Sequence, residues 1–175
     1  MLNSFKEQLK QLVIDPNDKF HLHLRKRVGK RATLLLEKRL KQIILLMPGV
    51  VARIYVLWER DKTPLQAKHL GGFLLAYMYH PKDFFPEQDY GLFGYLDDAY
   101  VAAAIYQEVL KDSAAAGIKI EAADEKLLKD LLTLKKAVKT VIPKEIEKIE
   151  KMIEEFKVGN QRTYLAMFKD EAVSA

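Results

Sequence analysis

Cysteine is absent from the 175 residues of this chain. Its absence excludes disulfide bonds and thiol chemistry, and it fits a reducing compartment. The first residues, Met-Leu-Asn-Ser-Phe-Lys-Glu, lack the pattern of a secretory signal. We therefore expect a cytoplasmic protein.

Long hydrophobic runs are also missing. The longest, residues 43–52, has ten residues and is interrupted by Pro48-Gly49, whereas a membrane-spanning helix needs about 20. The sequence therefore predicts no transmembrane span. Strand signals are almost absent too: Phe20, Leu22 and Leu24 alternate with polar residues, a pattern that suits an extended arm or the start of a helix.

Recognisable catalytic motifs are lacking. The chain has no glycine-rich phosphate loop, no Gly-x-Ser-x-Gly, no His-Glu-x-x-His and no credible triad. His21 and His23 could share one face of an extended chain, but a zinc site needs further ligands. These absences favour a non-catalytic protein without a cofactor.

Helical periodicity dominates what is present, and 49% of the residues are hydrophobic, enough for a real core. We predict an all-α, multi-helix bundle with a central helical hairpin at about residues 63–115, joined by an acidic Pro/Gly loop. We expect a single domain, residues 1–175. It comprises a basic arm (1–29), a core (30–115) and C-terminal helices (122–170).

Within the core, several features predict local structure. Pro48-Gly49 predicts a break or kink between two helices, and Thr63 before Pro64 predicts a helix start with a hydroxyl cap. Gly71-Gly72 inside the next helix suggests that another backbone passes close by, or a simple kink. One apolar helical face is expected from residues at helical spacing: Leu34, Leu35, Leu40, Ile43, Ile44 and Met47.

Residues 80–98 form the most unusual segment. Turn-forming residues set its shape, and we assign loop-shaping roles to Pro81, Pro86 and Gly94. The segment also carries five carboxylates: Asp83, Glu87, Asp89, Asp97 and Asp98.

This segment has a recurring order: a Pro-x-Asp, two apolar residues, a proline followed by an acid, a glycine, and Leu-Asp-Asp opening an apolar helix. The residues in these places are Pro81, Asp83, Phe84, Phe85, Pro86, Glu87, Gly94, Leu96, Asp97 and Asp98. Over about residues 72–107 the chain thereby resembles the YkvA-like family, a small helical domain of unknown function. The resemblance implies a helical fold and no known activity.

Asp83, Asp97 and Asp98 have two interpretations. In the structural one, carboxylates at turn and helix starts accept hydrogen bonds from orphan N–H groups and complement the helix dipole. In the other, they hold a divalent cation. Adjacent helical residues point about 100° apart, so at most one of Asp97 and Asp98 would join Asp83.

Arg53 stands alone in an apolar segment, residues 50–58. A buried arginine needs a carboxylate partner, and Asp97 or Asp98 is the obvious candidate for an ion pair. The alternative is that Arg53 extends along its own stem to the surface.

Positive charge is concentrated near the N-terminus. Residues 1–62 carry 14 basic against 6 acidic residues, although the whole chain has a net charge of only +5. Residues 19–41 hold nine basic residues and one acid. This run is either a solvated face or a docking surface for an anionic partner, with these candidate contacts: Arg25, Lys26, Arg27, Lys30 and Arg31.

The sequence thus favours a non-catalytic interaction or scaffold protein. Its partner would be an unidentified protein or, through the basic run, an anionic membrane surface or nucleic acid; membrane docking would place it at the membrane periphery. The alternative is a metal-dependent enzyme that uses the acidic loop 80–98.

Overall fold

The structure is a computed structural model that describes residues 2–80 and 84–160. Helices account for 83% of these residues, and no strand occurs among them. The predicted all-α, multi-helix bundle is therefore confirmed. The elements are α1 (Leu2–Ile14), α2 (Phe20–Trp58), α3 (Leu65–Met78), α4 (Glu87–Tyr90), the 3-10 helix η1 (Gly91–Gly94), α5 (Tyr95–Ala115), α6 (Ala122–Val141) and α7 (Pro143–Lys157).

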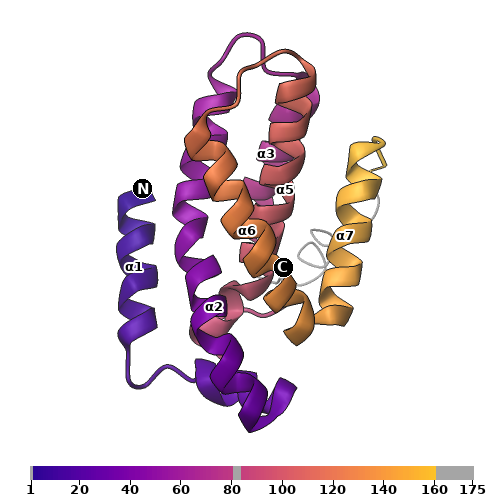
Figure 1. Ribbon diagram of the computed structural model, residues 1–175. Helices are drawn as coiled ribbons and strands as arrows, with labels where there is room; N and C mark the ends of the chain where they lie inside the picture. Colours follow the sequence, from indigo (N-terminus) through magenta and orange to yellow (C-terminus); the bar gives the residue numbers. More distant parts are fainter. Residues whose placement is uncertain (1, 81–83, 161–175) are drawn as a thin grey trace, which may run out of the picture.

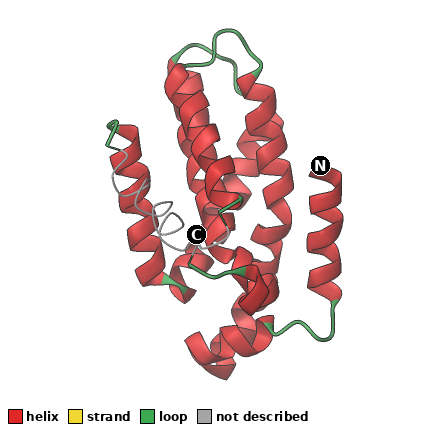
Figure 2. Ribbon diagram, turned by 180° about the vertical axis from the view of Figure 1, so that it is seen from behind, coloured by secondary structure: helices red, strands yellow, loops and turns green. Residues whose placement is uncertain are grey.

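Helix α5 lies at the centre of the bundle. It packs against α2, α3 and α6, while α1 and α7 flank the bundle on opposite sides (Figure 1). The view from behind shows the same arrangement (Figure 2). Of the 21 residues of α5, 14 are buried. This explains why its sequence is apolar nearly all round, since a helix enclosed by others needs no polar face.

The predicted helical hairpin consists of α3 and α5, which pack along each other. Helix α5 ends just before Gly117. The φ of Gly117 is +77°, in the left-handed conformation that often ends a helix. The backbone N–H of Ile118 then donates a 3.0 Å hydrogen bond to the Ser113 carbonyl. Gly117 therefore ends α5.

A break or a kink was expected at Pro48-Gly49. The break is wrong, because α2 runs continuously through this position, while the kink stays a prediction. Proline lacks the N–H that would bond to the preceding turn. Here Pro48 is buried together with Met47 and Val50, and we attribute the continuity of the helix to this packing. The interruption lies instead at Gly29, whose φ of 78° and ψ of 168° are not helical.

Two helices cover most of the expected basic arm over residues 1–29, because α1 ends at Ile14 and α2 begins at Phe20. Of the two interpretations of the alternation over residues 20–24, the start of a helix is therefore confirmed. Helix α1 packs on α2, and its Leu9 is fully buried. Phe20 and Leu24 are also buried, whereas Leu22 between them is exposed. The alternation in the sequence therefore marks one face of a helix, because residues four apart lie on the same side.

Thr63 and Gly71 have roles different from those expected. Pro64, not Thr63, occupies the N-cap of α3, and the Thr63 hydroxyl donates to the carbonyl of Leu57 at the end of α2. A Cβ on Gly71 would lie 3.0 Å from Nε1 of Trp58. The close neighbour at Gly71 is thus a side chain rather than another backbone, and the Trp58 indole N–H donates to the carbonyl of Lys68 at 2.9 Å.

One described helix, α2, contains an 18-residue window with the length and apolarity of a membrane span. The mean hydropathy of this window is 1.7, and half of it is buried inside the bundle, as in the core helix of many folds. The last part of the predicted C-terminal helices (122–170), from residue 161 onward, lies outside the described residues.

Candidate functional site

Asp97 and Asp98 lie in the first turn of α5, and both side chains are buried. The hydroxyl of Tyr77 on α3 donates a 2.8 Å hydrogen bond to Asp97 Oδ2. This bond joins the two helices of the hairpin near their connecting loop. Negative charge in a first turn also interacts favourably with the helix dipole. Asp97 therefore helps to pack α3 on α5, while capping of backbone amides by the pair stays a prediction.

Asp83 and Pro81 lie outside the described residues. Among the residues that are described, no group of three or more histidine or carboxylate side chains is placed to hold a metal ion. A site made by Asp83 with Asp97 or Asp98 is therefore not tested by the structure.

The two histidines near the N-terminus of α2 do not form a common site. His21 Nδ1 lies 2.9 Å from the carboxylate of Glu37. The ring of His23 instead packs against those of Tyr90 and Phe93, with centroids 5.0 and 5.6 Å away. The extended chain that would align the two imidazoles is absent, because this segment is a helix.

Pro86 and Gly94 bracket a tight turn. Pro86 occupies the N-cap of α4, where its fixed φ suits the entry into a helix. A Cβ on Gly94 would lie 2.6 Å from the carbonyl oxygen of Phe85 and 3.0 Å from Cα of Glu87. Only glycine fits this close backbone approach without rearrangement, which gives Gly94 a physical reason for its predicted loop-shaping role.

Asp18, which the sequence analysis did not single out, joins this turn to the start of α2 by hydrogen bonds of its carboxylate. Its Oδ1 accepts a 2.8 Å hydrogen bond from the backbone N–H of Phe20, at the start of α2. Its Oδ2 accepts another of 2.8 Å from the N–H of Leu92 in η1. An aspartate whose side chain accepts from the backbone N–H two residues on forms an Asx turn, which is a recognisable local signal, but nothing local points to Leu92.

Arg53 is ion-paired, but with carboxylates of α6 and its N-cap rather than with Asp97 or Asp98. Its guanidinium donates hydrogen bonds of 2.6 Å from Nε and Nη2 to the two oxygens of Asp124. A further bond of 2.8 Å runs from Nη2 to Glu121. Tyr106 of α5 also donates to Asp124 through its hydroxyl. Three helices, α2, α5 and α6, therefore meet at Asp124.

The charges in this cluster stabilise one another. Burial acts to raise the pKa of Asp124, but hydrogen bonds from Arg53 and Tyr106 outweigh it and hold the pKa below its usual range. Hydrogen bonds to Asp124 and Glu121 raise the pKa of Arg53 above its ordinary value. Burial, and then the bond to Asp124, raises the pKa of Tyr106. The cluster therefore holds charged Arg53 and Asp124 beside a neutral tyrosine. We interpret it as an ion pair that stabilises the fold.

The basic residues of α2 gather at one end of the molecule. The segment around Gly29 extends beyond the lower end of the bundle (Figure 1). We call residues 22–39 the basic end. Six cationic side chains on it are exposed, and none has an ion-pair partner within the described ranges: Arg25, Lys26, Lys30, Arg31, Lys38 and Arg39.

Arg27 differs from its neighbours, although the sequence places it in the same run. It donates a 3.0 Å hydrogen bond to Glu145 of α7 and lies over the ring of Phe85, 5.0 Å from its centroid. Arg27 therefore connects α2 to α7 and to the acidic loop.

Leu34 and Leu35, two members of the expected apolar helical face, are exposed by 70% and 72%. Leu22 is exposed by 53%. Their neighbours Thr33 and Leu36 are buried or packed against the core, so Leu34 and Leu35 lie on the outer face of α2. Each lies three or four positions from cations of the basic end, the spacing of neighbours on a helix surface. Periodicity alone cannot distinguish such a face from a buried one.

A family model described as "Protein of unknown function (DUF1232)" matches residues 67–104. This segment contains most of the hairpin, from α3 through the acidic loop into α5. The match supports similarity to a family of unknown function, while the narrower YkvA-like resemblance stays a prediction. No curated protein and no solved structure matches the chain.

Proposed function

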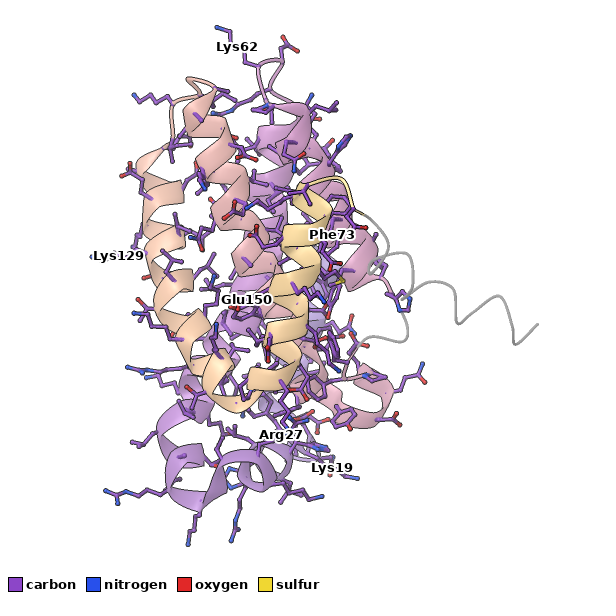
Figure 3. All side chains as sticks on the ribbon, turned by 90° about the vertical axis from the view of Figure 1, so that its right-hand side faces the viewer. Lys19, Arg27, Lys62, Phe73, Lys129 and Glu150 are labelled. Carbon is purple, nitrogen blue, oxygen red and sulfur yellow. The ribbon has the colours of Figure 1, made fainter. Side chains whose placement is uncertain are left out.

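We propose that this protein has a non-catalytic role and docks on anionic membrane surfaces through its basic end. The observation that carries the proposal is the combination of six exposed, unneutralised cations with three exposed leucines on one protruding segment. Figure 3 supports the placement: side chains that end in nitrogen project from the lower end of the molecule, near Lys19 and Arg27.

Electrostatic attraction favours such docking. Anionic lipids give a membrane a negative surface potential, and each lysine or arginine close to it contributes about 1 kcal/mol. Arg25 and Lys26 lie before the break at Gly29, and Lys30 and Arg31 follow it. The break therefore brings charges from two helical segments to the same tip, where they can approach a surface together.

The exposed leucines add a contribution that charge alone does not supply. Interfacial helices combine basic residues with apolar side chains that insert between headgroups. Complete burial of one leucine contributes about 1.5–3 kcal/mol. Leu22, Leu34 and Leu35 are positioned for insertion because nothing else in the described structure covers them.

Nucleic acid is a weaker candidate for this surface. Proteins that bind single strands combine positive charge with aromatic side chains on which bases stack. The one aromatic residue within residues 19–41, Phe20, is buried. The exposed leucines could insert into lipid but would gain nothing from a phosphate backbone. This difference favours lipid as the partner.

Co-sedimentation with vesicles tests the proposal. The protein is expected to sediment with phosphatidylcholine–phosphatidylserine vesicles, less at moderate than at low salt, and to stay in solution with phosphatidylcholine alone. Reversing four charges (R25E/K26E/K30E/R31E) should abolish binding without unfolding the protein. Arg27 is retained because its reversal would place a carboxylate beside Glu145.

A matched control reverses four exposed lysines elsewhere: Lys62, Lys126, Lys129 and Lys136. Lys62 lies at the opposite end of the molecule and Lys129 on its flank (Figure 3). This variant has the same net charge as the test variant and should still bind. If both variants lose binding equally, net charge rather than the basic end is responsible. Retention on generic duplex DNA but not on vesicles would contradict the membrane proposal in favour of nucleic acid.

A further inference from the structure

A groove of about 550 Å³ lies between the last turn of α1 and the middle of α2. Its size is within the range of small-molecule sites, about 300–1,000 Å³. Seven residues line it, whereas a specific protein–protein interface takes about 20–30 residues from each partner. The groove therefore suits a small molecule better than a partner protein.

The apolar lining of this groove is long and belongs mostly to α2. Leu34 and Leu45 lie on the same side of α2, and Val13 of α1 forms the facing wall. A rise of 1.5 Å per residue places the two leucines about 16 Å apart along the helix axis. Most of the surface between them is apolar. These dimensions suit an extended hydrocarbon chain.

The excess charge of the groove is positive. Its charged lining residues are Glu37, Lys38 and Lys41. The Glu37 carboxylate is already paired, with Lys41 at 2.9 Å and His21 at 2.9 Å, and Lys41 also lies over the ring of Phe20. Lys38 is exposed and has no ion-pair partner in residues 2–80 and 84–160. A ligand therefore meets one unneutralised cation.

This cation limits what the groove can hold. An organic cation would be repelled by Lys38, and a neutral hydrocarbon would gain nothing from it. A second copy docked symmetrically on the same groove would bring its own Lys38 against the first, and like charges disfavour such pairing. A lysine stem can cover a hydrocarbon chain while its ammonium group stays at the rim. The complementary ligand is therefore an anion with an apolar body.

We infer that the groove between α1 and α2 binds one long-chain carboxylate, such as an ionised fatty acid. Its hydrocarbon chain lies along Leu34 and Leu45, and its carboxylate lies at the rim within reach of Lys38. The ligand binds as a single molecule from solution, so the inference does not depend on membrane docking. The cations reversed in the vesicle experiment do not belong to the lining of this groove.

The test uses two probes of equal chain length with the full chain, decanoate and decylammonium, at concentrations too low for micelles. Titration calorimetry should show decanoate binding about tenfold more tightly, because attraction to an exposed cation replaces repulsion from it. Methyl NMR spectra locate the ligand. The methyl signals of Val13 and Leu45 should shift on addition of decanoate, whereas those of Leu65 should not. Leu65 is exposed by 66% but does not line the groove.

Lys38→Gln tests the charge preference. It should reduce the preference for decanoate over decylammonium several-fold. Lys30→Gln is the matched control, because Lys30 is also an exposed lysine of α2 but does not line the groove. At physiological salt, exposed charges are screened over about 8 Å, so the control should leave the preference nearly unchanged. Both side chains are exposed, and circular dichroism should show that both variants fold.

Leu34→Ser and Leu35→Ser test the apolar part and separate this site from membrane docking. The two leucines are almost equally exposed neighbours, but Leu34 lines the groove and Leu35 does not. Leu34→Ser should weaken the binding of both probes several-fold, whereas Leu35→Ser should weaken neither. Both substitutions should reduce vesicle binding alike, because both remove an exposed leucine that the membrane proposal uses.

Four results would overturn the inference. The first is equal affinity of the parent protein for decanoate and decylammonium. The second is a preference that Lys30→Gln reduces as much as Lys38→Gln. The third is an equal effect of Leu34→Ser and Leu35→Ser on decanoate. The fourth is a shift of the Leu65 methyl signals as large as that of Val13, which would show general association with exposed apolar side chains. Vesicle binding that persists beside any of these results would leave membrane docking intact.

Discussion

The guanidinium of Arg53 donates two hydrogen bonds of 2.6 Å to the carboxylate of Asp124 and so joins α2 to the first turn of α6. Asp124 is 1% exposed. Removing its carboxylate leaves the Tyr106 hydroxyl and the guanidinium without their shared acceptor. The cluster is therefore a point where one substitution affects three helices.

Asp124→Ala should lower the free energy of unfolding by about 3 kcal/mol, as expected when one partner of a buried ion pair is lost. Urea denaturation monitored by circular dichroism measures the change. Glu121→Ala is the control, because Glu121 also pairs with Arg53 but is exposed. It should have a much smaller effect, and equal losses from both variants would contradict the central role of Asp124.

The cluster also predicts a pH dependence. The pKa of Asp124 is lowered in the folded protein, so its stabilising contribution is complete above the ordinary aspartate pKa of about 4. The contribution is lost as the pH falls through the lowered, folded-state pKa. The difference in unfolding free energy between the parent and Asp124→Asn should therefore shrink below pH 4. A difference that is constant from pH 3 to pH 6 would disprove this linkage.

Gly94→Ala should destabilise the protein by about 2 kcal/mol, because its Cβ would overlap the carbonyl oxygen of Phe85. Gly49→Ala is the matched substitution with the opposite expectation. Gly49 is helical, and a Cβ there has no neighbouring atom within 4 Å. That change should stabilise the protein by about 0.5–1 kcal/mol. Melting temperatures of the two variants should shift in opposite directions.

Asp18→Ala should destabilise the protein by about 2 kcal/mol, because two backbone N–H groups, of Phe20 and Leu92, lose their acceptor. Asp15→Ala removes a similar but local bond to the N–H of Asn17 and does not involve η1. Hydrogen exchange distinguishes the two variants: the Leu92 amide should exchange faster only in Asp18→Ala. Unchanged protection of Leu92 would show that other contacts hold the turn.

Several helix ends follow from single residues. Gly117 and Gly159 adopt positive φ where α5 and α7 end, and Pro143 is the first residue of α7. Backbone preferences of glycine and proline act over a few residues, so the sequence shows their effect directly. The fold class follows from the 3.6-residue period of the apolar positions for the same reason, because that period needs no knowledge of what each face contacts.

Contacts between residues that are distant in the sequence cannot be predicted from the sequence in this way. The sequence shows that Arg53 needs a carboxylate, but the choice of Asp124 over Asp97 or Asp98 depends on how α6 crosses α2. In the same way, Leu34 and Leu35 have the spacing of a core face, yet they are exposed because they lie on the side of α2 that faces away from the core. A side chain's chemistry is local, whereas its burial and its partner depend on the relative placement of whole helices, and only the folded bundle determines that placement.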